Sequence, residues 1–157
     1  DHLDYHGTME AYLAAKARLV GYVADQGAVV VNADDPSWAA LARRPRTVTY
    51  SALGERGADV AAEGCRYDAA GTAFTLRVGG ARLDARLPLI GDFNVANALG
   101  AAAAAVALGM PPEVAAARLA ALPQVPGRLE RLHDAPAVLR DYAHTPDALE
   151  RALHAVR

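Results

Sequence analysis

The sequence predicts an α/β fold, and three stretches indicate it. Between residues 9 and 51, segments with helical spacing of apolar side chains alternate with short apolar runs, in the order helix, strand, helix, strand. Residues 60–87 change to apolar–polar alternation broken by glycine turns, which is typical of an antiparallel meander. Residues 137–157 then read as a strand, a polar loop and a helix. We therefore expect a parallel sheet with flanking helices, a small antiparallel sheet, and the start of a second α/β unit.

Composition limits the classes of function. The 157 residues are 53% hydrophobic, enough for the core of about one domain, and the net charge of −2 gives no electrostatic case for nucleic acid or an anionic membrane as a partner. The single cysteine excludes an internal disulfide and a cysteine-based metal cluster. No run of about 18 apolar residues and no signal peptide are present, so we expect a cytoplasmic location. The chain starts without methionine and stops inside an expected helix, so we expect a piece of a longer protein.

The first helix carries an unusual lysine. Thr8 is a good N-cap, which predicts a helix from Met9 to about Ala24. Lys16 falls among the apolar positions of this helix, which predicts that it lies on the buried face. It can snorkel to water, or burial can make its amine a nucleophile that adds carbon dioxide and becomes a carbamate, an oxygen ligand suited to magnesium. His2 lies just upstream, where the chain can fold back beside Lys16, but spacing alone does not decide between these interpretations.

The following elements form the sheet. Residues 28–31 predict a buried parallel strand, 36–43 a short helix and 47–51 a second strand. The polar residues after the first strand can bind a ligand at its carboxyl end or can serve as turn and cap residues, and we interpret them as turn residues; they are Asn32, Asp34 and Asp35. Strands are expected at 60–67, 72–78 and 81–87, with three arginines on the solvated face: Arg77, Arg82 and Arg86.

A helix is predicted from about residue 92 to 108, and another from 112 to 122, where Pro112 stands near the first position. Asp92 or Asn94 is expected to cap the first of these helices. Asn94 and Asn97 lie three residues apart, so their amides point the same way, and an amide complements the edge of an adenine. Capping and adenine binding are equally compatible with this pattern.

A Pro/Gly cluster at residues 123–127 predicts a domain boundary, with one domain at 1–127 and a second that starts at 128–157. Arg128 follows the cluster and is either a solvated charge or a fork for phosphate oxygens. A strand at residues 137–139 leads into a polar loop and a helix that Thr145 caps, which is a usual place for a nucleotide. There Asp141 can accept hydrogen bonds from ribose, and His144 can approach phosphate.

Four phrases in this order resemble the Mur ligases, and among them the MurE type, which adds the third amino acid to UDP-MurNAc-dipeptide. They are DHLDYHGTMEAYLAAK, GDFNVANAL, VPGRLE and DYAHTPDALE, and they span the whole chain. The resemblance implies the second half of a central ATPase domain and the first strand and helix of a Rossmann-like C-terminal domain. It also implies an ATP-dependent ligase that phosphorylates the dipeptide carboxylate and lets an amino-acid amine attack the acyl phosphate.

The resemblance assigns roles to single residues. Carbamylated Lys16 and His2 are implied to hold Mg²⁺, Asn94 and Asn97 to hold the adenine of ATP, Arg128 to reach phosphate and Asp141 to contact ribose. The implied partners are UDP-MurNAc-dipeptide and either diaminopimelate or lysine, with the enzyme as a monomer. The chain contains no G-x-x-x-x-G-K-[ST] loop, so we expect it to be inactive alone. The alternatives are a cyanophycin or folylpolyglutamate synthetase-like ligase, or a non-catalytic nucleotide-binding module.

Overall fold

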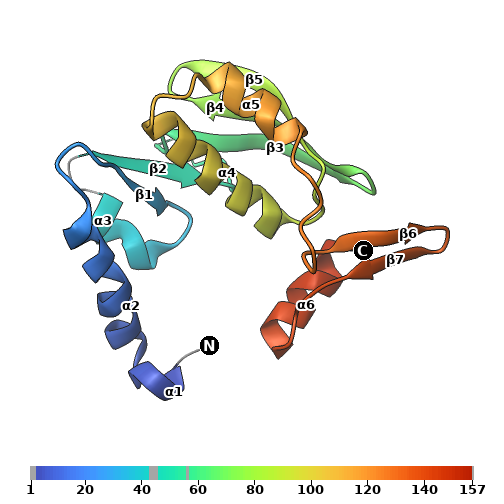
Figure 1. Cartoon of the computed structure of the whole chain (residues 1–157), viewed down its shortest axis with the longest axis horizontal. Coiled ribbons are helices and arrows are strands. Elements are labelled where there is room, and N and C mark those ends of the chain that lie inside the picture. The colour runs from blue at the N-terminus through green and yellow to red at the C-terminus, as the bar shows by residue number, and fades with distance from the viewer. Residues whose placement is uncertain (1–2, 43–45, 56, 157) are drawn as a thin grey trace.

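The structure is a computed structural model that describes residues 3–42, 46–55 and 57–156. Figure 1 shows these residues as an arch, with a sheet and its covering helices between an N-terminal arm and a C-terminal arm. The helices are α1 Leu3–His6, α2 Met9–Ala17, η1 Arg18–Tyr22, η2 Pro36–Trp38, α3 Ala39–Ala42, α4 Asp92–Ala107, α5 Pro112–Ala120 and α6 Pro146–Ala155. The strands are β1 Val29–Asn32, β2 Thr47–Ser51, β3 Val60–Asp68, β4 Gly71–Val78, β5 Ala81–Leu87, β6 Glu130–Asp134 and β7 Ala137–Arg140.

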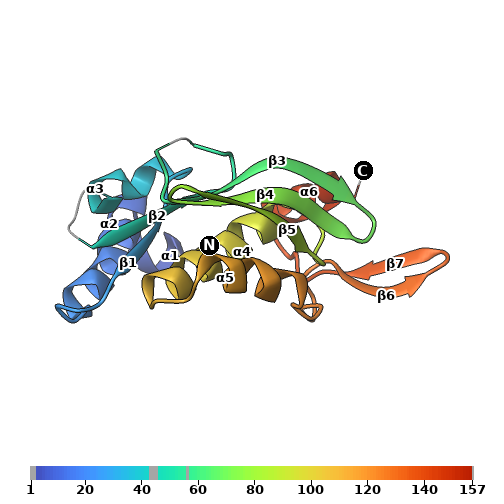
Figure 2. The ribbon, with the colours of Figure 1, turned by 90° about the horizontal axis from the view of Figure 1, so that it is seen from above.

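The predicted α/β fold is confirmed, and the predicted parallel strands and meander join in one sheet. Its strand order is β1-β2-β3-β4-β5. β1 pairs with β2 and β2 with β3 in parallel, whereas β3, β4 and β5 pair in antiparallel fashion. In Figure 2, α4 and α5 lie along one face of this sheet. A second sheet consists of β6 and β7.

The core lies between the sheet and α4. Leu99 and Val95 of α4 are fully buried, as are Val60, Leu76 and Leu87 of the strands. Gly100 lies in the middle of α4, and a Cβ there would stand 3.3 Å from the ring of Tyr50. The glycine therefore lets the helix approach the sheet closely at this point. Over the residues that the structure describes, no helix has both the length and the apolar character that a bilayer crossing requires.

The first helix starts as predicted but ends early. The Thr8 hydroxyl accepts a hydrogen bond from the Ala11 backbone at 3.1 Å, which confirms the predicted cap. The predicted end at about Ala24 is wrong, because α2 stops at Ala17 and continues as the 3₁₀ helix η1. Gly21 lies in this stretch, and glycine costs about 1 kcal/mol relative to alanine in an α-helix.

Of the two acidic residues after β1, Asp35 serves as a cap, as we interpreted it, whereas Asp34 makes long-range hydrogen bonds to the end of β2 and the loop after it. The Asp34 carboxylate accepts hydrogen bonds from the Ser51 hydroxyl at 2.5 Å and from the Ala52 backbone at 2.7 Å. The Asp35 carboxylate accepts one from the Ser37 backbone at 2.9 Å and so caps η2. The carboxyl end of β1 is thereby fastened to the carboxyl end of β2.

The prediction that all three meander arginines are solvated is wrong for Arg77. Only 15% of its side chain is exposed. Its guanidinium donates to the backbone carbonyls of Ala58 and Glu55, both at 2.9 Å, and forms an ion pair with Glu63 at 3.1 Å. Both carbonyls lie outside the strand ladders, and Arg77 reaches them from β4. The Glu55 carbonyl also accepts a hydrogen bond from the Ala58 backbone at 3.2 Å.

Arg77→Met is expected to lower the free energy of unfolding by about 2 kcal/mol, because loop carbonyls and a carboxylate lose their donor. Arg86→Met is the matched control, since Arg86 is half exposed and its pair with Asp68 is long, at 3.6 Å. The control should change stability by no more than about 0.5 kcal/mol. Urea denaturation measures both. Equal losses in the two variants would contradict a special role for Arg77.

The start of α4 differs from the prediction. Neither Asp92 nor Asn94 caps the helix, because the N-cap is Gly91, with φ of 98°, and no side chain bonds there as a cap. The Asn94 amide instead donates to the Ile90 carbonyl at 2.8 Å. The next helix, α5, begins at Pro112 as predicted.

The C-terminal arm is a hairpin followed by a helix. The predicted strand is found as β7, but it pairs antiparallel with β6, which was not predicted. β6 is mostly charged or polar, so it lacks the apolar alternation that marks a strand. Thr145 caps α6 as predicted, with its hydroxyl accepting from the Ala148 backbone at 3.3 Å. Gln124 joins this arm to the sheet, because its amide donates to the Pro88 carbonyl at 2.7 Å and accepts from the Arg131 backbone at 3.4 Å.

Candidate active site

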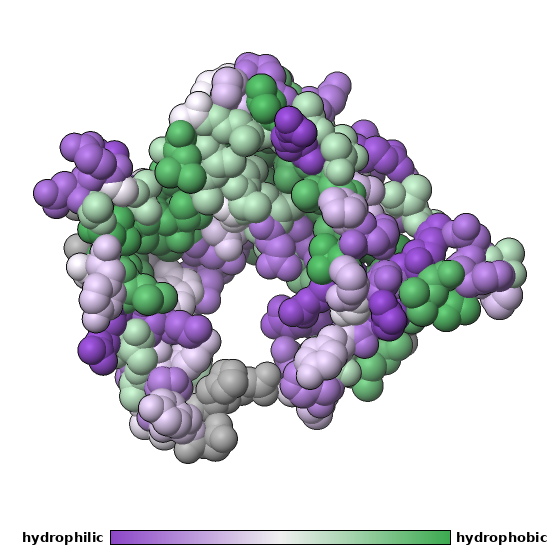
Figure 3. All heavy atoms as spheres, in the orientation of Figure 1, coloured by the Kyte–Doolittle hydropathy of each residue, from purple (hydrophilic) through white to green (hydrophobic). Residues whose placement is uncertain are grey.

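The predicted site residues come from three parts of the arch. Lys16 lies on α2, and Asn94 and Asn97 lie in the first turns of α4. The other three lie in loops of the C-terminal arm: Arg128, Asp141 and His144. Figure 3 shows open space between the two arms, with many hydrophilic residues on its border. Among the described residues, no hydrogen bond or ion pair joins Lys16 or the α4 amides to the C-terminal loops. His2 lies outside the described residues.

Lys16 is exposed, so the prediction that it lies on a buried face is wrong. None of the α2 residues is buried. The Lys16 ammonium lies 5.5 Å from the centre of the Tyr12 ring, within the range of a cation–π contact. Helical spacing grouped Lys16 with the apolar side chains correctly, but it does not reveal whether that face is covered. An exposed amine on this face is accessible to a ligand.

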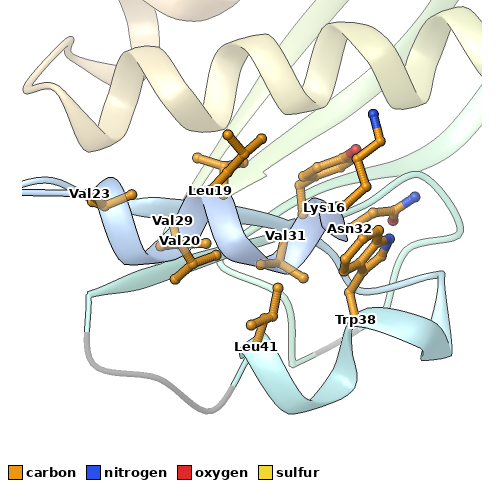
Figure 4. A pocket seen from close by; sticks show the side chains of 12 residues that line it. Lys16, Leu19, Val20, Val23, Val29, Val31, Asn32, Trp38 and Leu41 are labelled. Carbon is orange, nitrogen blue, oxygen red and sulfur yellow. The ribbon is translucent and has the colours of Figure 1, made fainter. Parts of the chain in front are cut away.

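A cavity of about 390 Å³ lies beside Lys16. Figure 4 shows part of its walls, with Val31 of β1 on the same side as Trp38 and Leu41 and Leu19 of η1 on the other side. The Lys16 amine points away from Trp38 and Leu41. Tyr50 and Asn32 add polar atoms to the wall. Partial burial, followed by the nearby negative charges of Asp34 and Asp35, raises the pKa of the Tyr50 phenol. Tyr50 is therefore a neutral hydrogen-bonding group at pH 7.

The amino-acid composition also singles out Lys16, which the spacing of apolar residues does not. Of the 16 Lys and Arg residues in the sequence, Lys16 is the only lysine. A general need for positive charge is met by arginine everywhere else in this chain. A compact primary amine can be deprotonated and can react with carbon dioxide, whereas a guanidinium stays protonated. The exception favours chemistry that needs an amine.

The two asparagines of α4 differ in accessibility. Asn94 is 3% exposed and uses its amide nitrogen to hold the Ile90 carbonyl, whereas Asn97 is exposed. Only Asn97 therefore presents its whole amide to a ligand in this structure. The adenine-binding role of the pair stays a prediction.

Arg128 and Asp141 are brought together by the backbone. The Asp141 carboxylate accepts hydrogen bonds from the Leu129 backbone at 2.9 Å and the Ala143 backbone at 2.8 Å. Each carboxylate oxygen has a further lone pair, so Asp141 can still accept from a ribose hydroxyl. Arg128 itself is exposed. His144 is also exposed, and one of its ring nitrogens lies 3.0 Å from the Tyr142 carbonyl.

These residues fit a nucleotide better than they fit a metal ion. An exposed guanidinium suits phosphate oxygens, and an exposed amide suits a base edge. Among the described residues, no three His, Cys, Asp or Glu side chains gather closely enough to hold a metal ion. Lys16 as a free amine offers Mg²⁺ no oxygen. The described residues therefore do not form a magnesium site by themselves.

Comparison with known proteins identifies the family. The model of the Mur ligase middle domain matches residues 1–105. This chain belongs to the Mur ligase family. A ligase from Synechococcus elongatus, named UDP-N-acetylmuramoyl-L-alanyl-D-glutamate–2,6-diaminopimelate ligase, is 44% identical over 163 residues, which cover 100% of this chain and 32% of the relative. The chain thus spans about a third of the length of the curated Mur ligases it matches.

Solved Mur ligase structures share the fold. A structure of a UDP-N-acetylmuramoyl-L-alanyl-D-glutamate–2,6-diaminopimelate ligase is 35% identical, with a TM-score of 0.78 over 99% of this chain and 33% of that chain. MurF from Acinetobacter baumannii is 26% identical, with a TM-score of 0.86 over 98% of this chain and 34% of that chain. The matches include the C-terminal arm, so the whole arch is a Mur ligase arrangement.

Proposed function

We propose that this chain is the central and linker portion of a ligase that adds 2,6-diaminopimelate to UDP-N-acetylmuramoyl-L-alanyl-D-glutamate with ATP, as a step of peptidoglycan synthesis. The observation that carries the proposal is the 44% identity over the whole chain to a ligase named for that reaction. In this proposal ATP phosphorylates the dipeptide carboxylate, and the amine of diaminopimelate displaces the phosphate. The enzyme works in the cytoplasm as a monomer, with no nucleic-acid or membrane partner.

The residues take the following roles in the proposal. Asn97, with Asn94 behind it, holds adenine, and Asp141 holds ribose. Arg128 and His144 face phosphate, where the guanidinium opposes the negative charge that moves during phosphoryl transfer. Lys16, as a carbamate, and His2 would hold Mg²⁺, which would neutralise phosphate charge when bound. The exposure of Asn97 and Arg128 supports their roles, because each side chain is accessible. The carbamate role of Lys16 rests on the family resemblance, since its amine is exposed and not buried.

The test compares the 157-residue chain with the full-length protein that contains it. The full-length protein should form ADP and the UDP-linked tripeptide from ATP, the UDP-linked dipeptide and diaminopimelate. The chain alone should show no ATP turnover above background, because it has no G-x-x-x-x-G-K-[ST] loop to cradle the phosphates. Lysine in place of diaminopimelate is the specificity control. The proposal is overturned if the full-length protein ligates neither diaminopimelate nor lysine.

A further inference from the structure

Hydrogen bonds hold the backbone of the turn that carries Arg128, both before and after this residue. The Gly127 carbonyl accepts a hydrogen bond from the Tyr142 backbone at 2.8 Å, and the Gly127 backbone N–H donates to the Glu130 carboxylate at 2.9 Å. The Leu129 N–H donates to Asp141 at 2.9 Å. Leu129 is buried, at 4% exposure, and has φ of 47°, a left-handed conformation that a leucine seldom adopts. The backbone on either side of Arg128 is therefore held in one unusual conformation.

Glu130 is the centre of this arrangement. One of its oxygens accepts from the Gly127 backbone and also from two nitrogens of Arg140, at 2.9 Å and 2.6 Å. Its side chain is 17% exposed, so most of it is shielded from water. The Gly127 hydrogen bond, followed by the contact with Arg140, keeps the pKa of the Glu130 carboxyl below its usual value. Glu130 is therefore charged at neutral pH, and its hydrogen bond with Gly127 weakens only in acid, when the carboxylate is protonated.

Glu130 forms its ion pair with Arg140 and not with Arg128. This ion pair uses one carboxylate oxygen of Glu130, the same oxygen that accepts from the Gly127 backbone. Within the part of the chain that the structure describes, no ion pair or hydrogen bond of the Arg128 guanidinium is found. The cation of Arg128 thus stays available for an anion from outside the chain.

We propose that Glu130 is a positioning residue for Arg128, because it fixes the Gly127–Leu129 turn that carries Arg128. The inference rests on the proposed function, in which Arg128 reaches nucleotide phosphate. Glu130 does not contact phosphate in this account and acts through Arg128. The kinetic effect of replacing Glu130 should therefore disappear when Arg128 is absent.

The experiment is a double-mutant cycle in the full-length protein, with ADP formation measured against ATP and dipeptide concentrations. Glu130→Ala should lower kcat/KM for ATP about tenfold, since a contact group displaced by about 1 Å can cost up to ~10²-fold. KM for the UDP-linked dipeptide should not change. Glu130→Gln keeps an amide oxygen for the Gly127 N–H but loses the charge, so its loss should be smaller, about threefold. In an Arg128→Ala background, Glu130→Ala should cause no further loss.

Glu113→Ala is the matched control, because Glu113 is an exposed acid in the first turn of α5, and it should leave kinetics unchanged. An equal loss from Glu130→Ala with and without Arg128 would overturn the inference and make Glu130 merely structural. The inference would also be overturned if Glu130→Ala has normal kinetics while Arg128→Ala is strongly impaired. An Arg128→Ala variant with unchanged kinetics would also overturn it, while ligation by the unmodified protein would still support the proposed function. Failure of the unmodified protein to ligate is the separate result that sinks the proposed function.

Discussion

Lys16→Ala in the full-length protein is expected to lower ligation by at least about 10²-fold, the loss typical when a group that stabilises transition-state charge is removed. Lys16→Arg should be equally inactive, because arginine keeps the positive charge and the long stem but cannot form a carbamate. A lysine that only covers apolar surface with its stem would tolerate arginine. The arginine variant therefore separates the chemical role from the packing role.

Mass spectrometry provides the second measurement. Native spectra taken in bicarbonate, followed by acidification, should show a loss of about 44 Da, the mass of the carbon dioxide that a nucleophilic lysine can hold. Because Lys16 is the only lysine of this chain, a carbamate located to this segment by fragmentation of the protein has only one side-chain amine to occupy. The Lys16→Ala variant is the control and should show no such loss in this segment. Full activity of Lys16→Arg, with no carbon dioxide released by the unmodified protein, would make Lys16 structural.

The sequence predicted well where local patterns decide the structure. The strand at residues 47–51 was placed as the structure has it, and the alternating runs at 72–78 and 81–87 match β4 and β5 to within one residue. Alternating apolar and polar side chains, bounded by glycine turns, predict strands from neighbouring residues alone. The Thr8 and Thr145 caps were predicted for the same reason, since capping involves only the next three residues.

The errors concern contacts that are distant in the sequence. β6 exists because it pairs with β7, and its own residues carry no strand pattern. Arg77 is shielded because a loop some twenty residues earlier brings carbonyls to it. Lys16 was grouped with the right neighbours on α2, but nothing in its helix says whether that face is covered. For the candidate site, sequence therefore predicted the residue types and left their exposure and partners to the structure.

Glu130 illustrates the same limit within the site. The phrase VPGRLE points to Arg128, but the carboxylate two residues later looks like an ordinary surface charge in the sequence. Its importance depends on Arg140, ten residues away across the β6–β7 hairpin. Because the hairpin itself was not predicted, this contact was not predictable either. Positioning residues are generally harder to find than the residues they position, since their effect lies in tertiary geometry.

Leu99→Ala should lower the free energy of unfolding of the 157-residue chain by about 3 kcal/mol, within the range of 2–5 kcal/mol for buried leucines. Leu99 is fully buried between α4 and the sheet, so truncation leaves a cavity in a close-packed region. Leu108→Ala is the matched control at the end of the same helix, because Leu108 is 88% exposed, and it should change stability by no more than about 0.5 kcal/mol.

Urea denaturation followed by circular dichroism measures both leucine variants. A lower midpoint with an unchanged m-value for Leu99→Ala means that α4 and the sheet unfold together. The same helix carries Asn94 and Asn97, so that result also means that the candidate adenine site exists only while this core is intact. Equal small losses in the two variants would contradict the packing of α4 on the sheet. A changed m-value would show that the core and the rest of the chain do not unfold as one unit, because m follows the surface exposed on unfolding.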